Sequence, residues 1–154
     1  MSRVLVAGLG NEWRRDDGVG PAVALRVARM AVPGVRVIVN VGEPADLVDA
    51  WRGAEVAVVV DAMHGALEPG AHLRIDAADG ELSGLPVGVS GHSYALPNVV
   101  ELARALDAMP GRLLIFAVQG EAFDSGQGLT PAVAAAVERV AAEILDEIAA
   151  AVAP

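Results

Sequence analysis

Short apolar runs alternate with longer amphipathic segments along the chain. Four runs rich in valine, leucine and isoleucine predict strands: 3–8, 35–41, 55–61 and 112–119. Three segments in which apolar residues recur with helical spacing predict helices: 19–31, 45–51 and 95–108. Because strands and helices alternate, the pattern predicts an α/β fold.

A fourth helix has the clearest start in the sequence. Thr130 can cap it and Pro131 suits its first turn. One face of this helix is apolar throughout, formed by Val133, Val137, Val140, Ile144, Ile148 and Val152. The segment therefore predicts a long helix that packs on a sheet.

The character of two strands indicates how the sheet is built. The run 55–61 is apolar on both faces, as a parallel strand buried between two helical layers requires. The run 71–76 alternates apolar and polar residues, with His72 on its exposed side, and too few residues precede it for a helical crossover. We therefore expect a single three-layer domain over residues 1–154, with a mostly parallel, twisted, five-stranded sheet, one antiparallel edge strand, and helices on both faces.

Composition narrows the classes of function. The 154 residues carry 11 Lys and Arg against 20 Asp and Glu, a net charge of −9, which disfavours a nucleic-acid partner. The chain has no cysteine, so disulfides, thiolate nucleophiles and thiolate metal ligands are excluded. Although 54% of the residues are hydrophobic, no apolar stretch approaches the roughly 20 residues that cross a bilayer, and no signal peptide is evident. We expect a cytoplasmic protein without membrane contact.

Candidate chemistry follows from the edge of the sheet where ligands bind. In sheets of this kind the crevice lies at the carboxyl ends of the strands. Asp16 and Asp17 follow the first strand, and Asp61 ends the third. A glycine-rich loop is predicted at 80–91, and His92 lies at its end, in Ser90-Gly91-His92-Ser93. Two carboxylates and one imidazole form a reasonable site for nickel, zinc or manganese.

Each of these residues also has a purely structural interpretation. Asp17 could cap the helix that follows, Asp61 could accept backbone hydrogen bonds, and His92 could be solvated. His64, three residues after Asp61, could lie behind the site. The spacing contains no local metal-binding signature, so it makes only a weak case for a metal on its own.

Signatures of other enzyme classes are missing from the sequence. Gly8-Leu9-Gly10 follows a strand, but the third glycine of a dinucleotide-binding motif would fall at Trp13. There is no phosphate-binding Gly-Lys-Ser/Thr segment and no Gly-x-Ser-x-Gly nucleophile turn. Dinucleotide-binding, phosphate-loop and serine-hydrolase functions are therefore disfavoured.

Several segments taken together resemble a known family. They are Gly8-Leu9-Gly10-Asn11, Asp16-Asp17-Gly18-Val19-Gly20-Pro21, Asp61-Ala62, His92 and Gly128-Leu129-Thr130-Pro131. In this order, over essentially the whole chain, they look like those of the NiFe-hydrogenase maturation endopeptidases. Members of that family trim a C-terminal extension from the hydrogenase large-subunit precursor after nickel has been inserted. The resemblance implies that Asp17, Asp61 and His92 are the metal-contacting and catalytic residues.

The resemblance also suggests a mechanism. Three ligands without a thiolate hold nickel modestly, whereas a precursor that presents nickel on its own cysteines would complete the coordination sphere. Nickel supplied by the precursor, or another divalent metal in its place, would then act as the recognition element. Asp16 or another unligated carboxylate is a candidate general base.

Three alternatives remain open at the level of sequence. One is a non-cleaving, metal-dependent binding module or chaperone for such a precursor. A second is a peptidyl-tRNA hydrolase-like esterase, which shares the Gly-Leu-Gly-Asn opening but has a catalytic histidine segment where this chain has Arg15-Asp16-Asp17. The third is a structural role, in which the acidic loop does no more than cap the first helix.

Overall fold

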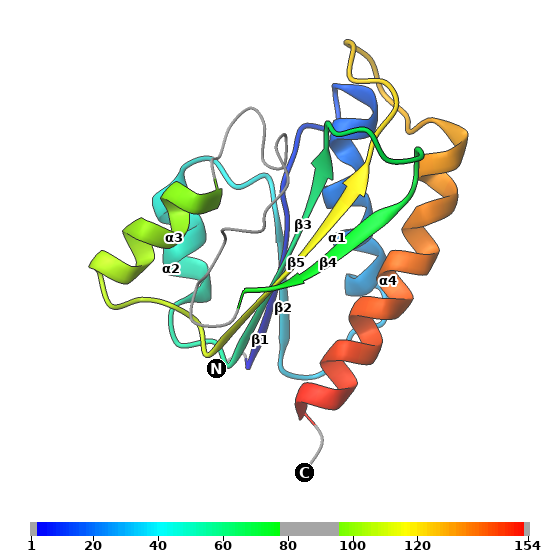
Figure 1. Ribbon diagram of the computed structural model, residues 1–154. Helices are drawn as coiled ribbons and strands as arrows, with labels where there is room; N and C mark the ends of the chain where they lie inside the picture. The colour runs from blue at the N-terminus through cyan, green and yellow to red at the C-terminus, as the bar shows by residue number, and fades with distance from the viewer. Residues whose placement is uncertain (1–2, 78–95, 153–154) are drawn as a thin grey trace.

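The computed structural model describes residues 3–77 and 96–152 (Figure 1). Its elements, in chain order, are β1 (Val4–Gly8), the 3-10 turn η1 (Arg15–Gly18), α1 (Val19–Ala28), β2 (Val35–Val39), α2 (Pro44–Trp51), β3 (Val56–Met63), β4 (His72–Asp76), α3 (Leu96–Ala105), β5 (Arg112–Gln119) and α4 (Pro131–Val152). No helix in these described ranges is both long and apolar enough to cross a membrane.

The five strands form one sheet in the order β2-β1-β3-β5-β4. The pairs β1–β2, β1–β3 and β3–β5 are parallel, and β4 runs antiparallel to β5. These pairings confirm the predicted α/β class, the mostly parallel sheet and its antiparallel edge strand.

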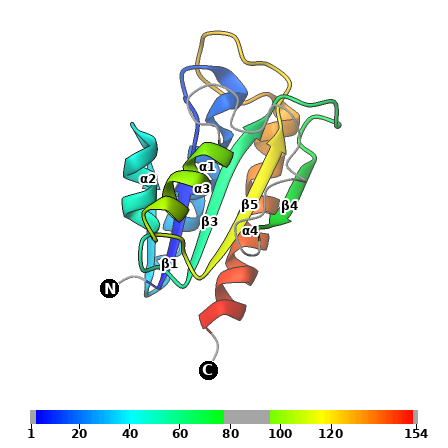
Figure 2. The ribbon, with the colours of Figure 1, turned by 60° about the vertical axis from the view of Figure 1, so that its left-hand side comes forward.

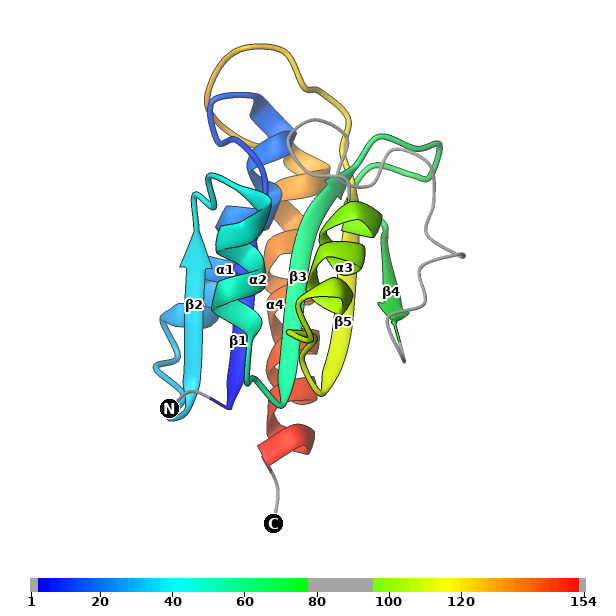
Figure 3. The same ribbon diagram turned by 90° about the vertical axis from the view of Figure 1, so that its left-hand side faces the viewer.

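Side-chain alternation along the strands creates two cores, one on each face of the sheet. On β3, Val58 and Val60 face one core, whereas Ala57 and Val59 face the other. Helices α1 and α4 cover the first face and α2 and α3 cover the second, as Figure 1 shows edge-on and Figure 3 shows from the α2–α3 side. The central strands need apolar residues on both faces for this reason.

Two glycines allow α1 to lie directly on the end of β1. A β-carbon at Gly20 would lie 2.2 Å from the carbonyl oxygen of Leu9 and 2.5 Å from that of Val60. A β-carbon at Gly8 would lie 2.4 Å from the carbonyl oxygen of Gly20. Any side chain at either position would push the helix off the sheet, so these glycines determine where the turn before α1 lies.

Several predicted boundaries differ from the observed ones. Helix α1 ends at Ala28, three residues earlier than predicted, because the chain turns there and Ala31 adopts a positive φ of 47°. Strand β2 ends at Val39, since Asn40 has a φ of 57°. Strand β3 continues two residues beyond Asp61, through its pairing with β5. The predicted loop at 80–91 lies outside the described residues.

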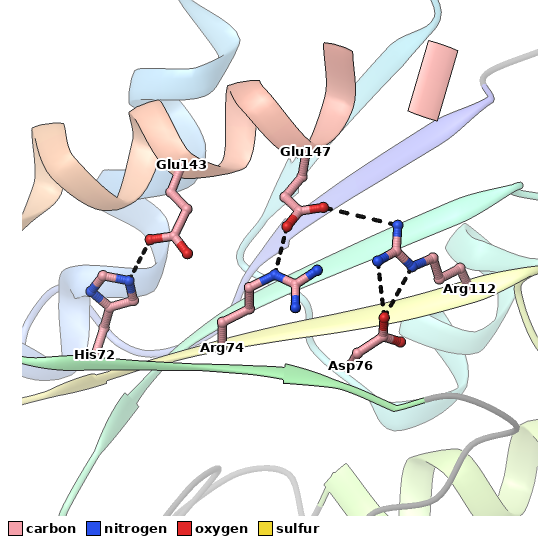
Figure 4. Close-up of polar contacts among 6 residues, drawn as sticks. All are labelled: His72, Arg74, Asp76, Arg112, Glu143 and Glu147. Atoms are coloured by element: carbon pink, nitrogen blue, oxygen red, sulfur yellow. Dashed lines mark hydrogen bonds and ion pairs between the residues drawn. The ribbon is translucent and has the colours of Figure 1, made fainter. Parts of the chain in front are cut away.

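The expectation that His72 lies on an exposed side of the edge strand is wrong. Its side chain is only 16% exposed, and its Nε2 lies 2.6 Å from Oε2 of Glu143 on α4. The polar positions of β4 lie on the side of the strand that faces α4, because the polar flank of this long helix lies across the edge of the sheet (Figure 4). His72 is partly buried there, whereas Arg74 and Asp76 remain exposed.

Candidate active site

Three loops meet at the carboxyl edge of the parallel strands. They are the segment between β1 and α1, the segment from β3 to β4, and the segment from β5 to α4, and all three lie at the same end of the molecule in every view (Figures 1, 2 and 3). This is the edge at which a sheet of this topology binds its ligands. The candidate residues described here all belong to it.

Asp61 lies where β3 loses one of its neighbours. The last register pair of β1 with β3 is Gly8 with Val60, so Asp61 is the first residue of β3 beyond β1. The Asp61 side chain is 5% exposed, and its Oδ1 accepts a hydrogen bond from the amide of Ala62 at 2.8 Å. By alternation with Val59, Asp61 belongs to the face that α2 and α3 cover. A buried carboxylate at this position is held in place by the strand itself.

Asp17 reaches the same edge from the turn η1, which packs against β3. The residue is 7% exposed, and its Oδ2 accepts a hydrogen bond from the backbone amide of Asn11 at 2.8 Å. Gly10, with a φ of 123°, fits against the Asp17 backbone, where a β-carbon would lie 2.0 Å from the carbonyl oxygen. Helix α1 has Gly18 at its N-cap and no side-chain cap, so Asp17 does not cap it. Within the described part of the chain, Oδ1 of Asp17 accepts no hydrogen bond.

Asp16 points away from this pair and into the β5–α4 segment. Its side chain is fully buried. Oδ2 accepts hydrogen bonds from the amides of Glu121 at 2.8 Å and Ala122 at 3.0 Å and from the hydroxyl of Thr130 at 2.7 Å. Oδ1 accepts one from the amide of Thr130 at 2.7 Å. The Thr130 hydroxyl, predicted to cap α4, is thus a donor to Asp16.

These contacts set the charge of Asp16. Burial alone raises the pKa of its carboxyl group, but the hydrogen bonds from Ala122, Thr130 and Glu121 favour the charged form and bring the pKa below its ordinary value. A carboxylate that already accepts four hydrogen bonds is a poor proton acceptor. These hydrogen bonds disfavour Asp16 as the general base and leave the other alternative, an unligated carboxylate, as the better candidate.

His92 lies outside the described residues. Asp17 and Asp61, the other two predicted site residues, are both buried, in segments that contact each other at the carboxyl edge of the sheet. Within the described ranges no group of three or more His, Asp and Glu side chains is close enough to hold a metal ion. Asp17 and Asp61 supply carboxylate oxygens, which suit a hard or borderline divalent cation, and a third ligand must come from elsewhere.

The sequence did not identify Phe123 as a residue of this region. Its ring stacks on the ring of His64, with centroids 3.6 Å apart and planes 18° apart. The same ring lies against Gly120, where a β-carbon would approach it to 2.3 Å. His64, which we expected behind the site, is thus held by the β5–α4 segment. The only sequence signal was the glycine that leaves space for the ring.

A shallow hollow of about 260 Å³ opens beside the turn η1, between α1 and the β5–α4 segment. Its lining combines apolar and polar side chains, from Glu12, Arg15, Gly18, Pro21, Ala22, Leu25, Gln127, Gly128 and Leu129. It is large enough to receive one or two side chains of another protein.

Comparison with known sequences assigns a family. The model of the hydrogenase maturation protease family matches residues 23–147. The chain is 30% identical over 151 residues to the hydrogenase expression/formation protein HupD of Thiocapsa roseopersicina, a match that covers 90% of this chain and 67% of the relative.

Solved structures show the same fold. The maturating endopeptidase HybD of Escherichia coli matches with a TM-score of 0.79 at 19% identity, over 95% of this chain and 91% of that one. The NiFe-hydrogenase maturation protease HybD of Thermococcus kodakarensis matches with a TM-score of 0.72 at 25% identity, over 96% and 99%. Two buried aspartates at the carboxyl edge of a sheet with this topology, in a chain that the family model matches over most of its length, lead to one conclusion. The chain belongs to the hydrogenase maturation protease family and is a peptidase.

Proposed function

We propose that this peptidase removes a C-terminal segment from the large-subunit precursor of a NiFe-hydrogenase, and that it recognises nickel carried by that precursor. The observation that carries the proposal is the burial of both Asp17 and Asp61 in segments that contact each other at this edge of the sheet. Two carboxylates from segments far apart in the sequence are buried at one edge of the sheet, where η1 packs against β3 just beyond the end of β1.

His92 is the third proposed ligand. Helix α3 begins at Leu96, four residues after His92, and covers the face of the sheet to which Asp61 belongs. This proximity along the chain supports a role for the imidazole beside the two carboxylates. Nickel, when bound, supplies a positive charge that polarises a peptide carbonyl or an attacking water.

This chain's own residues prepare that site. The Asn11 amide and the Ala62 amide each fix one carboxylate oxygen, of Asp17 and Asp61 respectively, so neither carboxylate has to be ordered when substrate arrives. Without a thiolate, this ligand set alone binds nickel modestly, so a precursor that brings nickel on its own cysteine sulfurs is bound in preference to one that lacks the metal.

The test compares nickel-loaded and nickel-free precursor. We expect mass spectrometry to show loss of a C-terminal peptide from the loaded precursor only. Equal cleavage of both would contradict recognition through nickel while leaving the peptidase intact. Absence of cleavage from the loaded precursor would contradict the proposed processing and favour a module that binds without cutting.

Site variants test the residue assignments. We expect Asp17→Asn, Asp61→Asn and His92→Ala each to lower processing about 100-fold or more, since each removes a proposed ligand, with circular dichroism unchanged. Asp146→Asn is the matched control, because Asp146 is exposed on α4. A variant that keeps wild-type activity would remove its residue from the site.

A further inference from the structure

The carboxylate of Asp16 accepts hydrogen bonds from both ends of the β5–α4 segment. Three of the four donors to Asp16 are backbone amides, and they lie at the two ends of the segment, at Glu121 and Ala122 on one side and at Thr130 on the other. The hydroxyl of Thr130 adds the fourth bond. Loss of Asp16 would leave these buried and partly buried donors without an acceptor. An unpaired buried donor is costly, so we expect the segment to move.

Further contacts join the same two segments along their length. The amide of Asp16 donates to the carbonyl of Ala122 at 2.9 Å, and the amide of Arg15 donates to the carbonyl of Gly126 at 3.0 Å. The Gly126 amide donates in return to the carbonyl of Trp13 at 2.8 Å. The two segments therefore form one unit, and its most buried polar group is the Asp16 carboxylate.

This unit also touches the third segment at the site. Phe123, which follows the first two donors, stacks on His64 of the chain that leaves β3. Asp17 is the next residue after Asp16 in the chain, and Asp61 lies three residues before His64. The unit held by Asp16 thus connects both carboxylates of the candidate site.

We propose that Asp16 is a positioning residue, which holds Asp17 beside Asp61 by binding both ends of the β5–α4 segment. Its place in catalysis rests on the proposed function, whereas its effect on the position of Asp17 does not. Asp16 itself touches no substrate, because its oxygens are used within the protein. Asparagine at this position keeps the size of the side chain but turns an NH₂ group toward backbone donors, so the unit must rearrange.

The experiment measures amide hydrogen exchange and steady-state kinetics on the full chain. We expect Asp16→Asn to speed exchange at Ala122 and at Asn11, whose amide is bonded to Asp17, and to lower kcat about 10-fold to 100-fold, as small misplacements of catalytic groups do.

A second pair of variants serves if Asp16→Asn fails to fold. Thr130→Val removes one of the four hydrogen bonds and should give a smaller loss of kcat with faster exchange at Asn11, whereas Thr130→Ser keeps the hydroxyl and should restore both. Ile148→Val is the control for a general loss of stability, because Ile148 is buried near the other end of α4. It should leave kcat and the exchange of Asn11 unchanged.

The outcomes separate the two proposals. Faster exchange at Ala122 with unchanged exchange at Asn11 would show that Asp16 holds the segment but not Asp17, and would overturn the inference. Wild-type kcat in Asp16→Asn despite faster exchange at Asn11 would overturn it as well. If the wild-type protein cleaves no precursor, the proposed function fails, and the exchange at Asn11 alone confirms or overturns the positioning of Asp17 by Asp16.

Discussion

Two adjacent aspartates have opposite surroundings in this protein. Asp16 is fully buried and accepts four hydrogen bonds, all from a segment more than 100 residues away in sequence. Among the residues that the structure describes, Asp17 accepts one hydrogen bond, from the amide of Asn11. Residue type therefore does not distinguish the structural carboxylate from the one at the site; the donors around each side chain do.

At the same scale, Gly20 is essential because backbone atoms surround it. We expect Gly20→Ala to lower the free energy of unfolding by about 2–3 kcal/mol, since the added methyl group would overlap two carbonyl oxygens that cannot move independently. Urea unfolding followed by circular dichroism measures the change.

Gly42→Ala is the matched control for Gly20→Ala. The nearest atom to a β-carbon at Gly42 is Oδ2 of Asp46 at 3.7 Å, and its φ is not in the left-handed region. We expect an effect within about 0.5 kcal/mol there. Equal effects at the two glycines would show that α1 does not depend on close approach to the sheet.

At the scale of elements, a row of ion pairs fastens the edge strand β4 to α4. His72, Arg74 and Asp76 alternate along β4 and point to the helix, where Glu143 and Glu147 are one turn apart (Figure 4). Arg112, the first residue of β5, bonds Asp76 at 2.9 Å and lies 3.9 Å from Glu147. The hydrogen bond to Glu147 raises the pKa of Arg74 further above its ordinary value, so the guanidinium is charged throughout the physiological range. These contacts give the polar residues of β4 partners on α4 and β5, although Arg74 and Asp76 remain exposed.

A double-mutant cycle with Arg74→Gln and Glu147→Gln tests this row. The two side chains are 33% and 19% exposed, and they belong to a network, so we expect a coupling of about 1 kcal/mol in the free energy of unfolding. Arg3 and Glu55, at 2.8 Å but 50% and 57% exposed, form the control pair, for which we expect a clearly smaller coupling. A larger coupling in the control pair would contradict a role for partial burial.

For the whole molecule, the sheet is the structure that both helical layers share. The strands β3 and β5 contribute alternate side chains to the two cores. Because both cores depend on the same strands, we expect neither to form without the other. The two tryptophans allow this to be observed. Trp51 is fully buried in the α2–α3 layer, whereas Trp13 is 59% exposed in the β1–α1 loop.

In a Trp13→Phe variant, fluorescence reports on Trp51 and hence on the α2–α3 layer alone. Far-ultraviolet circular dichroism receives its largest helical contribution from α4, the longest helix described, which lies on the opposite face. We expect the two signals to give the same urea midpoint, because loss of either layer exposes the shared strands. Separate midpoints would show that the layers unfold independently.

The sequence by itself determined the elements and the class of fold. The doubly apolar run before Asp61, the alternating run at β4 and the long apolar face of α4 are local patterns, and periodicity is sufficient to read them. Because residues that follow parallel strands meet at one edge, the strand pattern also pointed to Asp16, Asp17, Asp61 and His92 as candidates. The family resemblance narrowed these to Asp17, Asp61 and His92, whose roles remain predictions.

Only the tertiary structure showed how the surroundings of the acidic residues differ. The turn η1, the burial of Asp16 and the stacking of Phe123 on His64 all depend on partners brought close by the sheet and not by the chain. Likewise, the environment of His72 depends on where α4 crosses the edge strand. Hydrogen-bond donors and buried surfaces come from distant segments, so their effect on a side chain appears only once the chain is folded.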